Sequence, residues 1–110
     1  MHKDPKIRWA LSHAKWVMGL ESEMDVLKEY TRYTIKDIAH KVNCDVLLMS
    51  CAEDHLILAP LAGMCKNSLV NARSLTHIHY TRDSDGYLHC RVGALNSLYE
   101  TMFPWMDSLR

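Results

Sequence analysis

A short apolar segment, Val46 to Cys51, constrains the fold of this chain more than any other. It reads Val-Leu-Leu-Met-Ser-Cys, and after Ala52 it gives way to the acidic dipeptide Glu53-Asp54. An apolar run this short, rich in Val and Leu, predicts a strand buried on both faces, as in a parallel sheet. Open α/β sheets place ligands and chemistry beyond the carboxyl ends of their strands. The acidic dipeptide therefore marks a candidate functional site.

The pattern from residue 44 onward alternates between strands and helices. We expect a strand over 45–51, a helix starting at Pro60, a strand over 75–80, and a last helix after Gly93 that Pro104 should kink or break. A strand, a helix and a strand in succession form a βαβ unit, so the two strands should be parallel with a right-handed crossover. Two strands cannot bury both faces and both edges of a sheet. We therefore expect an α/β fold with an incomplete sheet.

The first 43 residues predict helices only. Asp4-Pro5 is typical of a helix start and Gly19 of a helix end, and a second helix is expected over 23–30. Thr34-x-x-Asp37 resembles a variant capping box and predicts a third helix over 34–42, with Ile35, Ile38, Ala39 and Val42 on its buried face. In the first helix, Trp9 and Trp16 should widen the apolar stripe. A Trp and Met stripe at helical spacing is more often plain core than the lining of an acyl pocket.

Composition and charge exclude several classes of function. The formal net charge is zero and no block of Lys or Arg occurs, which argues against a nucleic-acid partner. No apolar run approaches the roughly 18 residues that a membrane span requires, and the N-terminus lacks a signal-peptide pattern. The four cysteines have no CxxC spacing, so we expect them to be reduced and the compartment to be cytoplasmic.

Three segments together resemble the C-terminal part of the α/β-hydrolase superfamily. Residues 35–57 are similar to the passage where a helix ends, the penultimate core strand runs and the acid turn follows. Asn71-Ala-Arg-Ser-Leu-Thr and Leu88-His-Cys-Arg-Val-Gly-Ala-Leu-Asn resemble the surroundings of the last strand and of the histidine loop. The His-Cys followed by Val-Gly is similar to a branch of dienelactone-hydrolase-like and pseudooxynicotine-hydrolase-like enzymes. The resemblance implies a helical cap-like segment over 1–43, followed by the last two strands and helices of the hydrolase core over 44–110.

The resemblance also implies two catalytic residues. Asp54 would be the acid of a serine-type triad, which orients the imidazole, and His89 would be the base, which moves the proton. The order, with the acid before the histidine, is that of the last two triad members in this fold. Glu53 competes with Asp54 for the acid role, and His55 could orient the acid or be a plain loop residue. The alternative to the whole assignment is an ordinary loop carboxylate and an ordinary loop histidine.

The chain departs from the family pattern at two places. Cys51 and Ala52 stand where the family usually has a glycine in the acid turn. More importantly, no G-x-S-x-G elbow occurs, and the oxyanion-hole loop that belongs upstream is missing as well. The resemblance therefore implies the cap, acid and histidine portion of a hydrolase whose nucleophile is absent from this chain.

Two other chemistries have weaker support in the sequence. His77 and His79 share one face of the second strand, and with His89 and Cys90 they form a conceivable zinc site, although no metal-finger spacing supports it. Cys51 and Cys90 are possible thiol nucleophiles, but Cys51 ends a buried strand and the side chain of Cys90 points away from that of His89. We expect neither a metal nor a cofactor.

The sequence thus leads to one preferred function and two alternatives. The preferred function is the acid and base portion of a hydrolase that cleaves an ester, an amide or an activated C–C bond of a small acyl substrate, with the isolated chain inactive. The first alternative is an interaction half-domain that completes its sheet with a partner chain, by self-association for example. The second is a small histidine-rich metal-binding domain.

Overall fold

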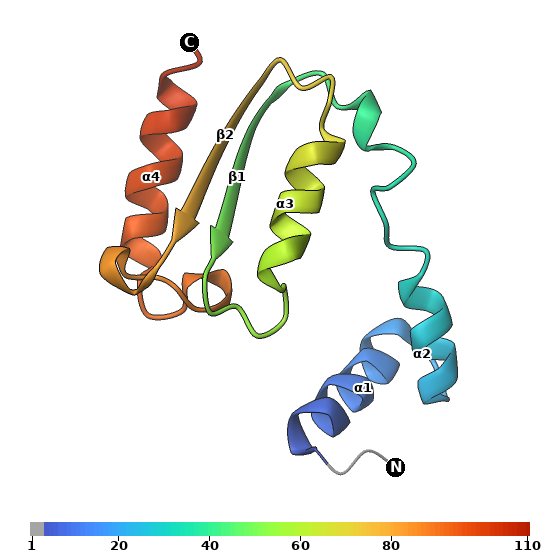
Figure 1. Ribbon diagram of the computed structural model, residues 1–110. Coiled ribbons are helices and arrows are strands. Elements are labelled where there is room, and N and C mark those ends of the chain that lie inside the picture. Colours follow the sequence, from blue (N-terminus) through green and yellow to red (C-terminus); the bar gives the residue numbers. More distant parts are fainter. Residues whose placement is uncertain (1–3) are drawn as a thin grey trace. The chain divides into compact units, whose positions relative to one another are not determined.

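The computed structural model describes residues 4–110 and divides the chain into two compact units, Met1–Ile35 and Lys36–Arg110. The first unit contains α1 (Pro5–Met18) and α2 (Glu23–Tyr30), which pack against each other (Figure 1). Each helix begins at a residue whose side chain caps its N-terminus. The sequence predicts this cap for α1, and α2 has an equivalent one. The Asp4 carboxylate accepts from the Lys6 amide at 2.8 Å, and the Ser22 hydroxyl accepts from the Asp25 amide at 3.0 Å. Both predicted helices are confirmed.

The buried side of the first unit is narrower than expected. Ala14 and Val26 are buried, whereas Trp9 is 67% exposed and Trp16 is 80% exposed. The expectation that these two tryptophans widen the buried stripe of α1 is therefore wrong. The contact with the eight-residue α2 covers only one narrow stripe of α1, and both indole rings lie outside it. One face of the unit consequently presents large aromatic side chains to solvent.

The predicted third helix over 34–42 does not form. Residues 36–38 make a turn, and only a short 3-10 helix, η1 (Ala39–Lys41), follows. Ala39 is buried, but Ile35 and Ile38, which were expected on the buried face, are exposed. A helix of nine residues is marginal unless its apolar face is packed, and β-branched residues add little helix propensity. Without a surface to cover Ile35 and Ile38, the segment adopts a turn instead.

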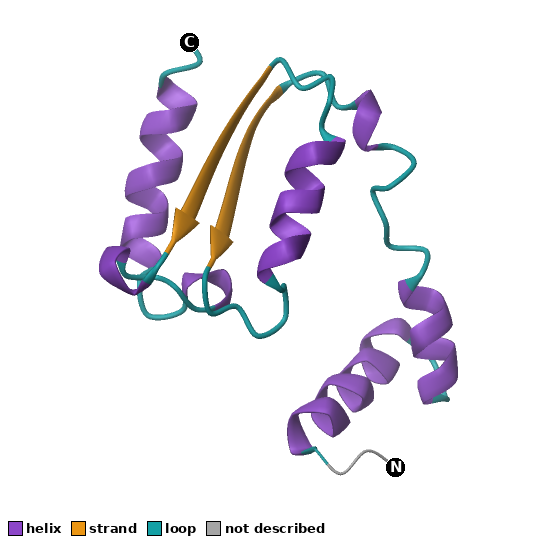
Figure 2. Ribbon diagram, viewed as in Figure 1, coloured by secondary structure: helices purple, strands orange, loops and turns teal. Residues whose placement is uncertain are grey.

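The second unit is built on two parallel strands, β1 (Asp45–Cys51) and β2 (Ser74–Tyr80), which are connected through α3 (Ala59–Ser68) (Figure 2). The register runs from Asp45 opposite Ser74 to Cys51 opposite Tyr80. The predicted α/β class and the parallel pairing are confirmed. In residues 4–110 no third strand joins this sheet, so one edge of β1 remains unpaired.

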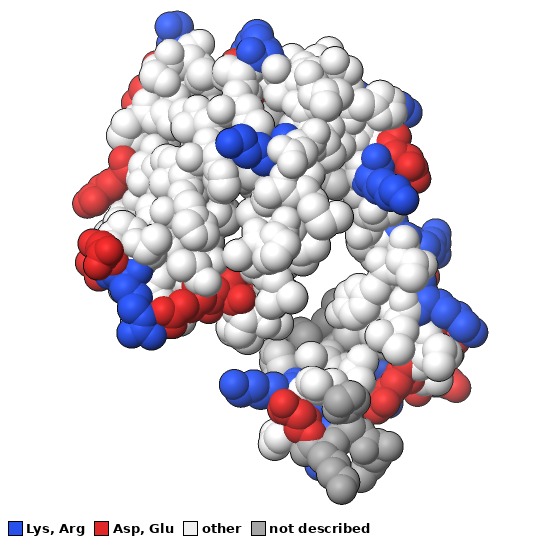
Figure 3. Space-filling model, viewed as in Figure 1, with Lys and Arg blue, Asp and Glu red and all other residues white. Residues whose placement is uncertain are grey.

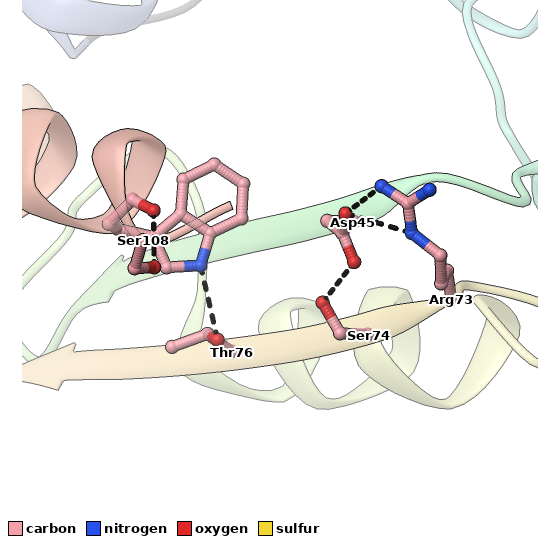
Figure 4. Close-up of polar contacts among 6 residues, drawn as sticks. Asp45, Arg73, Ser74, Thr76 and Ser108 are labelled. Atoms are coloured by element: carbon pink, nitrogen blue, oxygen red, sulfur yellow. Dashed lines mark hydrogen bonds and ion pairs between the residues drawn. The ribbon is translucent and has the colours of Figure 1, made fainter. Parts of the chain in front are cut away.

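The last helix, α4 (Leu95–Asp107), is anchored to β2 through two side-chain contacts. The Tyr80 hydroxyl donates to the hydroxyl of Thr101 at 3.0 Å. The indole N–H of Trp105 donates to the hydroxyl of Thr76 at 3.3 Å, and Figure 4 shows this indole beside the labelled Thr76. The helix continues past Pro104 as far as Asp107, so the expected break at Pro104 does not occur. The proline lies within one turn of the C-terminal end, where a lost backbone hydrogen bond interrupts little of the helix.

The amino ends of the two strands are joined by a polar cluster. The Asp45 carboxylate accepts from the Arg73 guanidinium and, at 2.6 Å, from the Ser74 hydroxyl (Figure 4). The hydrogen bond from Arg73, together with that from Ser74, lowers the pKa of Asp45 to about 2. The cluster therefore fixes the strand register at the end of the sheet opposite the candidate site.

The core of the second unit is small. Its buried apolar residues are Ala39, Cys51, Ala62 and Tyr80, and β1 from Asp45 to Ser50 is only half-buried. The composition of β1 predicts a strand that is covered on both faces, and the structure covers it less than that.

The face of the unit seen in Figure 3 is largely free of Lys, Arg, Asp and Glu. Among residues 4–110, no helix is long and apolar enough to cross a membrane.

Candidate active site

The acid turn begins directly after β1 and is shaped by the Asp54 side chain. Its Oδ1 atom accepts hydrogen bonds from the backbone amides of Leu56 and Ile57, each at 2.8 Å. An aspartate that caps the amides two and three residues ahead closes the chain into a compact turn. The side chain of Asp54 is only 9% exposed, so the turn holds the carboxylate in place.

The histidine loop follows β2 and contains two further short helices, η2 (Arg82–Ser84) and η3 (His89–Arg91). In η3, Cys90 and Arg91 adopt left-handed backbone conformations with φ angles of 52° and 55°. Such conformations are uncommon for residues other than glycine. They turn the chain sharply just after His89, whose side chain is 29% exposed.

The two loops leave the same end of the sheet, where both strand arrows terminate (Figure 1). His89 Nδ1 lies 2.9 Å from both carboxylate oxygens of Asp54, so the predicted contact between these side chains is confirmed. An ionised carboxylate can only accept, and Nδ1 must therefore carry the proton. In the neutral imidazole, the remaining nitrogen, Nε2, then has a free lone pair.

The carboxylate of Asp54 is held in its ionised form. Burial alone would raise its pKa, but the hydrogen bonds from the Ile57 amide, from His89 and from the Leu56 amide outweigh burial and lower the pKa below its ordinary value. An ionised acceptor beside Nδ1 fixes the orientation of the imidazole. The pair therefore has the tautomer that a general base requires.

Glu53, the competing candidate for the acid, is engaged elsewhere. Its carboxylate is exposed and pairs with the Arg82 guanidinium, one contact measuring 2.8 Å, and the hydrogen bond from Arg82 lowers the pKa of Glu53. The same guanidinium lies over the Tyr87 ring, 5.1 Å from its centroid. The Glu53 amide also donates to the Tyr87 carbonyl at 3.0 Å. Glu53 thus links the acid turn to the histidine loop, while Asp54 contacts the imidazole.

A cavity of about 300 Å³ adjoins the Asp54–His89 pair. Its walls come mainly from β1 and α3 and include Leu48, Met49, Ile57, Leu61 and Cys65, with Asp54, His89 and Cys90 also in the lining. His55 stands at the edge of the pair, with its ring edge-on to that of His89 at 5.8 Å. An apolar cavity beside an oriented imidazole suits the hydrocarbon part of a small substrate.

His77 and His79 do lie on one face of β2, as predicted, but they are bridged by a side chain that the sequence did not single out. The Ser50 hydroxyl oxygen is 2.8 Å from His77 Nε2 and 2.8 Å from His79 Nδ1. Burial, together with nearby Lys66 and His79, lowers the pKa of His77. Within residues 4–110 no group of three or more His, Cys, Asp or Glu side chains is arranged to hold a metal. The zinc hypothesis therefore gains no third ligand.

The two cysteines considered as nucleophiles differ in their surroundings. Cys51 is buried at the end of β1, and Cys90 is exposed in η3. Both cysteines border the cavity. His89 Nδ1 is hydrogen-bonded to Asp54, so this nitrogen is not available to either thiol.

Sequence reasoning missed Arg91, a residue of the histidine loop whose side chain is almost fully buried. A loop arginine normally predicts an exposed side chain, so no sequence signal identifies it.

Three fungal proteins are similar to nearly the whole chain. Hydrolase LUC6 of a Fusarium species is 25% identical over 113 residues, 93% of this chain and 25% of the relative. The 20-hydroxy-prefusarin hydrolase FUS2 of Gibberella moniliformis is 25% identical over 94% of the chain and 26% of its own length. Hydrolase acrC of Aspergillus aculeatus is 24% identical over 93% of the chain and 24% of its own length. No family model and no solved structure matches the chain.

All three relatives bear the name hydrolase. The chain spans about a quarter of the length of the curated relatives it matches.

Proposed function

We propose that this chain supplies the acid and the base of a serine-type α/β-hydrolase, with Asp54 as the acid and His89 as the base. The observation that carries the proposal is the contact of His89 Nδ1 with both oxygens of Asp54 at 2.9 Å, at the carboxyl ends of two paired parallel strands. Chemistry in open α/β sheets is found at this end. The distant hydrolase relatives add independent support.

In the proposed reaction, His89 Nε2 takes the proton of an attacking hydroxyl and later returns it to the leaving group. Asp54 keeps the proton of Nδ1 in place and stabilises the imidazolium that forms, without becoming protonated itself. The substrate would be a small ester, amide or activated C–C compound whose apolar part occupies the cavity beside β1 and α3. The same proposal places the chain in the branch of dienelactone-hydrolase-like and pseudooxynicotine-hydrolase-like enzymes.

The nucleophile and the oxyanion hole would come from a segment outside these 110 residues. Two observations support this part of the proposal. The chain corresponds to only about a quarter of each relative. Within residues 4–110, one edge of β1 is unpaired, although the composition of β1 suits a strand with neighbours on both sides. A serine elbow carried by another part of the sheet would then face His89 Nε2.

The test is the complete coding sequence from which the chain derives. We expect a G-x-S-x-G elbow upstream, and we expect the expressed protein to react with a fluorophosphonate at that serine. His89→Ala should lower turnover of a p-nitrophenyl ester by a factor of about 10³ to 10⁶, and Asp54→Asn by about 10⁴. Glu53→Gln is the matched control, because it removes the neighbouring carboxylate charge but not a partner of His89.

Two results would contradict the proposal. One is a complete coding sequence without a serine elbow. The other is fluorophosphonate labelling or ester turnover that His89→Ala leaves unchanged. A larger effect from Glu53→Gln than from Asp54→Asn would refute only the choice of acid.

The second candidate function is an interaction half-domain. The unpaired edge of β1 and the exposed Trp9 and Trp16 rings support it, because both are surfaces that another polypeptide can cover. This function predicts concentration-dependent dimerisation and no hydrolase activity in the complete protein. Sedimentation of the complete protein at several concentrations, together with the ester assay, distinguishes the two candidates.

A further inference from the structure

The most unusual charged group outside the Asp54–His89 pair is the guanidinium of Arg91. The residue is only 2% exposed, and its Nη2 donates to the Ser97 hydroxyl near the start of α4. Its Nε and Nη1 atoms have no hydrogen-bond partner among the described residues. Within this part of the chain no carboxylate pairs with the charge. The guanidinium instead lies against the Tyr80 ring, with its central carbon 3.3 Å from the ring centroid.

The histidine loop is shaped to admit this side chain. Gly86 has a φ angle of +65°, and a Cβ atom at that position would lie only 2.5 Å from Arg91 Nε. Any larger residue would therefore displace the guanidinium from its place. Tyr80 is fixed in turn, since its hydroxyl donates to that of Thr101 at 3.0 Å. Arg91 thus contacts the end of β2, the first part of the loop and the start of α4 at once.

Stability alone does not account for an arginine in this position. Burying a charge with two unpaired donors is unfavourable, and replacing such a group with an apolar side chain of similar size is often neutral or stabilising. The backbone on which the side chain sits is itself strained, because Cys90 and Arg91 are both left-handed. Strain of this kind persists only where surrounding contacts hold it. The contacts of Arg91 with Tyr80 and Ser97 can hold the turn in this strained conformation.

We propose that Arg91 is a positioning residue that holds the turn of residues 89–91 against Tyr80 and Ser97, so that His89 Nδ1 faces Asp54. The guanidinium anchors one end of the three-residue turn, and the imidazole projects from the other end. The Arg91 amide donates to the Leu88 carbonyl and its carbonyl accepts from the Ala94 amide, both at 2.9 Å, which ties the turn on either side. The proposal rests on the proposed function only where it treats the Asp54–His89 pair as catalytic. The effect of Arg91 on the contact between these two side chains can be measured independently of that function.

The experiment measures the Asp54–His89 contact directly by NMR in the 110-residue chain. The observables are the exchange with water of the His89 Nδ1 proton and the pKa of Asp54. Arg91→Met keeps the length of the side chain and removes its charge, so we expect the proton to exchange about tenfold faster, as for the loss of one hydrogen bond. The pKa of Asp54 should rise, because burial continues to raise it while the hydrogen bond from His89, which lowers it, is weakened. Arg91→Lys, which keeps the charge over Tyr80, should restore part of both signals.

Arg73→Met is the matched control, because it removes the same charge at the opposite end of the strands. It should leave the Nδ1 proton unchanged. The proposal is overturned if Arg91→Met lowers the melting temperature but leaves the proton exchange and the Asp54 pKa at their original values, since Arg91 would then be merely structural. If Arg91→Met does not fold, Ser97→Ala decides, because it removes the hydroxyl that accepts from Arg91 Nη2, and a folded Ser97→Ala variant with an unaltered Nδ1 proton also overturns the proposal. Ester turnover is not read, so failure of the proposed function remains distinguishable.

Discussion

Replacing Asp54 with alanine should destabilise the second unit far more than its position in a loop suggests. The carboxylate accepts three hydrogen bonds, two from backbone amides at 2.8 Å and one from His89 at 2.9 Å, and its side chain is nearly buried. A hydrogen bond between neutral groups contributes about 0.5–1.5 kcal/mol net, and one to a charged group about 1.5–3 kcal/mol. Because Leu56 and Ile57 are exposed, water replaces part of what their amides lose.

We therefore expect Asp54→Ala to lower the free energy of unfolding by about 2–3 kcal/mol, below the roughly 4.5–9 kcal/mol that three hydrogen bonds to a charged group would contribute together, because water replaces part of the loss. A unit of this size has a total stability of roughly 4–11 kcal/mol, so the loss is a large fraction of it. Asp54→Asn should cost less, about 1–2 kcal/mol, because one amide oxygen still caps the turn while its NH₂ group faces the His89 donor.

Urea titration followed by circular dichroism measures both differences. Glu53→Ala is the control, since it truncates the adjacent acid, which is exposed and pairs with Arg82. Its effect should be clearly smaller than that of Asp54→Ala. Equal destabilisation by the two substitutions would refute the view that the buried Asp54 carboxylate organises the acid turn.

Three further predictions concern the isolated chain. Its stability should be complete above roughly pH 5 and fall on acidification, because the folded-state pKa values of Asp45, Glu53 and Asp54 lie below the unfolded ones; denaturant titrations from pH 6 to pH 2 test this, and a flat profile contradicts it. It should not turn over p-nitrophenyl esters, since the elbow serine is absent, and turnover that His89→Ala abolishes would show that another group attacks. It should bind hydrophobic dyes and self-associate through its exposed tryptophans and open strand edge, whereas a monodisperse monomer that melts sharply above roughly 60 °C would disprove this.

The elements that the sequence predicts well depend on local signals. The strand expected over 45–51 is observed as Asp45–Cys51, and the one expected over 75–80 as Ser74–Tyr80. A continuous apolar run and an alternating pattern each predict a strand without knowledge of its partners. The first two helices are equally local, since a capping side chain or a Gly19 C-cap is next to the residues it affects. The acid and the histidine follow from the strand ends together with the family resemblance.

The elements that the sequence misses depend on what packs against them. Whether Ile35 and Ile38 lie on a helix depends on a covering surface, which the segment itself does not encode. The burial of Arg91 requires the bare backbone of Gly86 and the ring of Tyr80, which come together only once the loop has folded. The contact of Ser50 with two histidines requires the register between the strands, because alternation gives the face but not the partner.

The Ser50 bridge couples the proton positions on two imidazoles. A hydroxyl has one hydrogen, so it can donate to His77 Nε2 or to His79 Nδ1 but not to both, and the other nitrogen must donate to the hydroxyl oxygen. In the neutral state the two rings are therefore restricted to paired tautomers: moving the proton on one ring requires the hydroxyl to rotate and the other ring to change as well. Ser50→Ala would remove this coupling between the two rings, so that the tautomer of each histidine would depend only on its own hydrogen bonds with water.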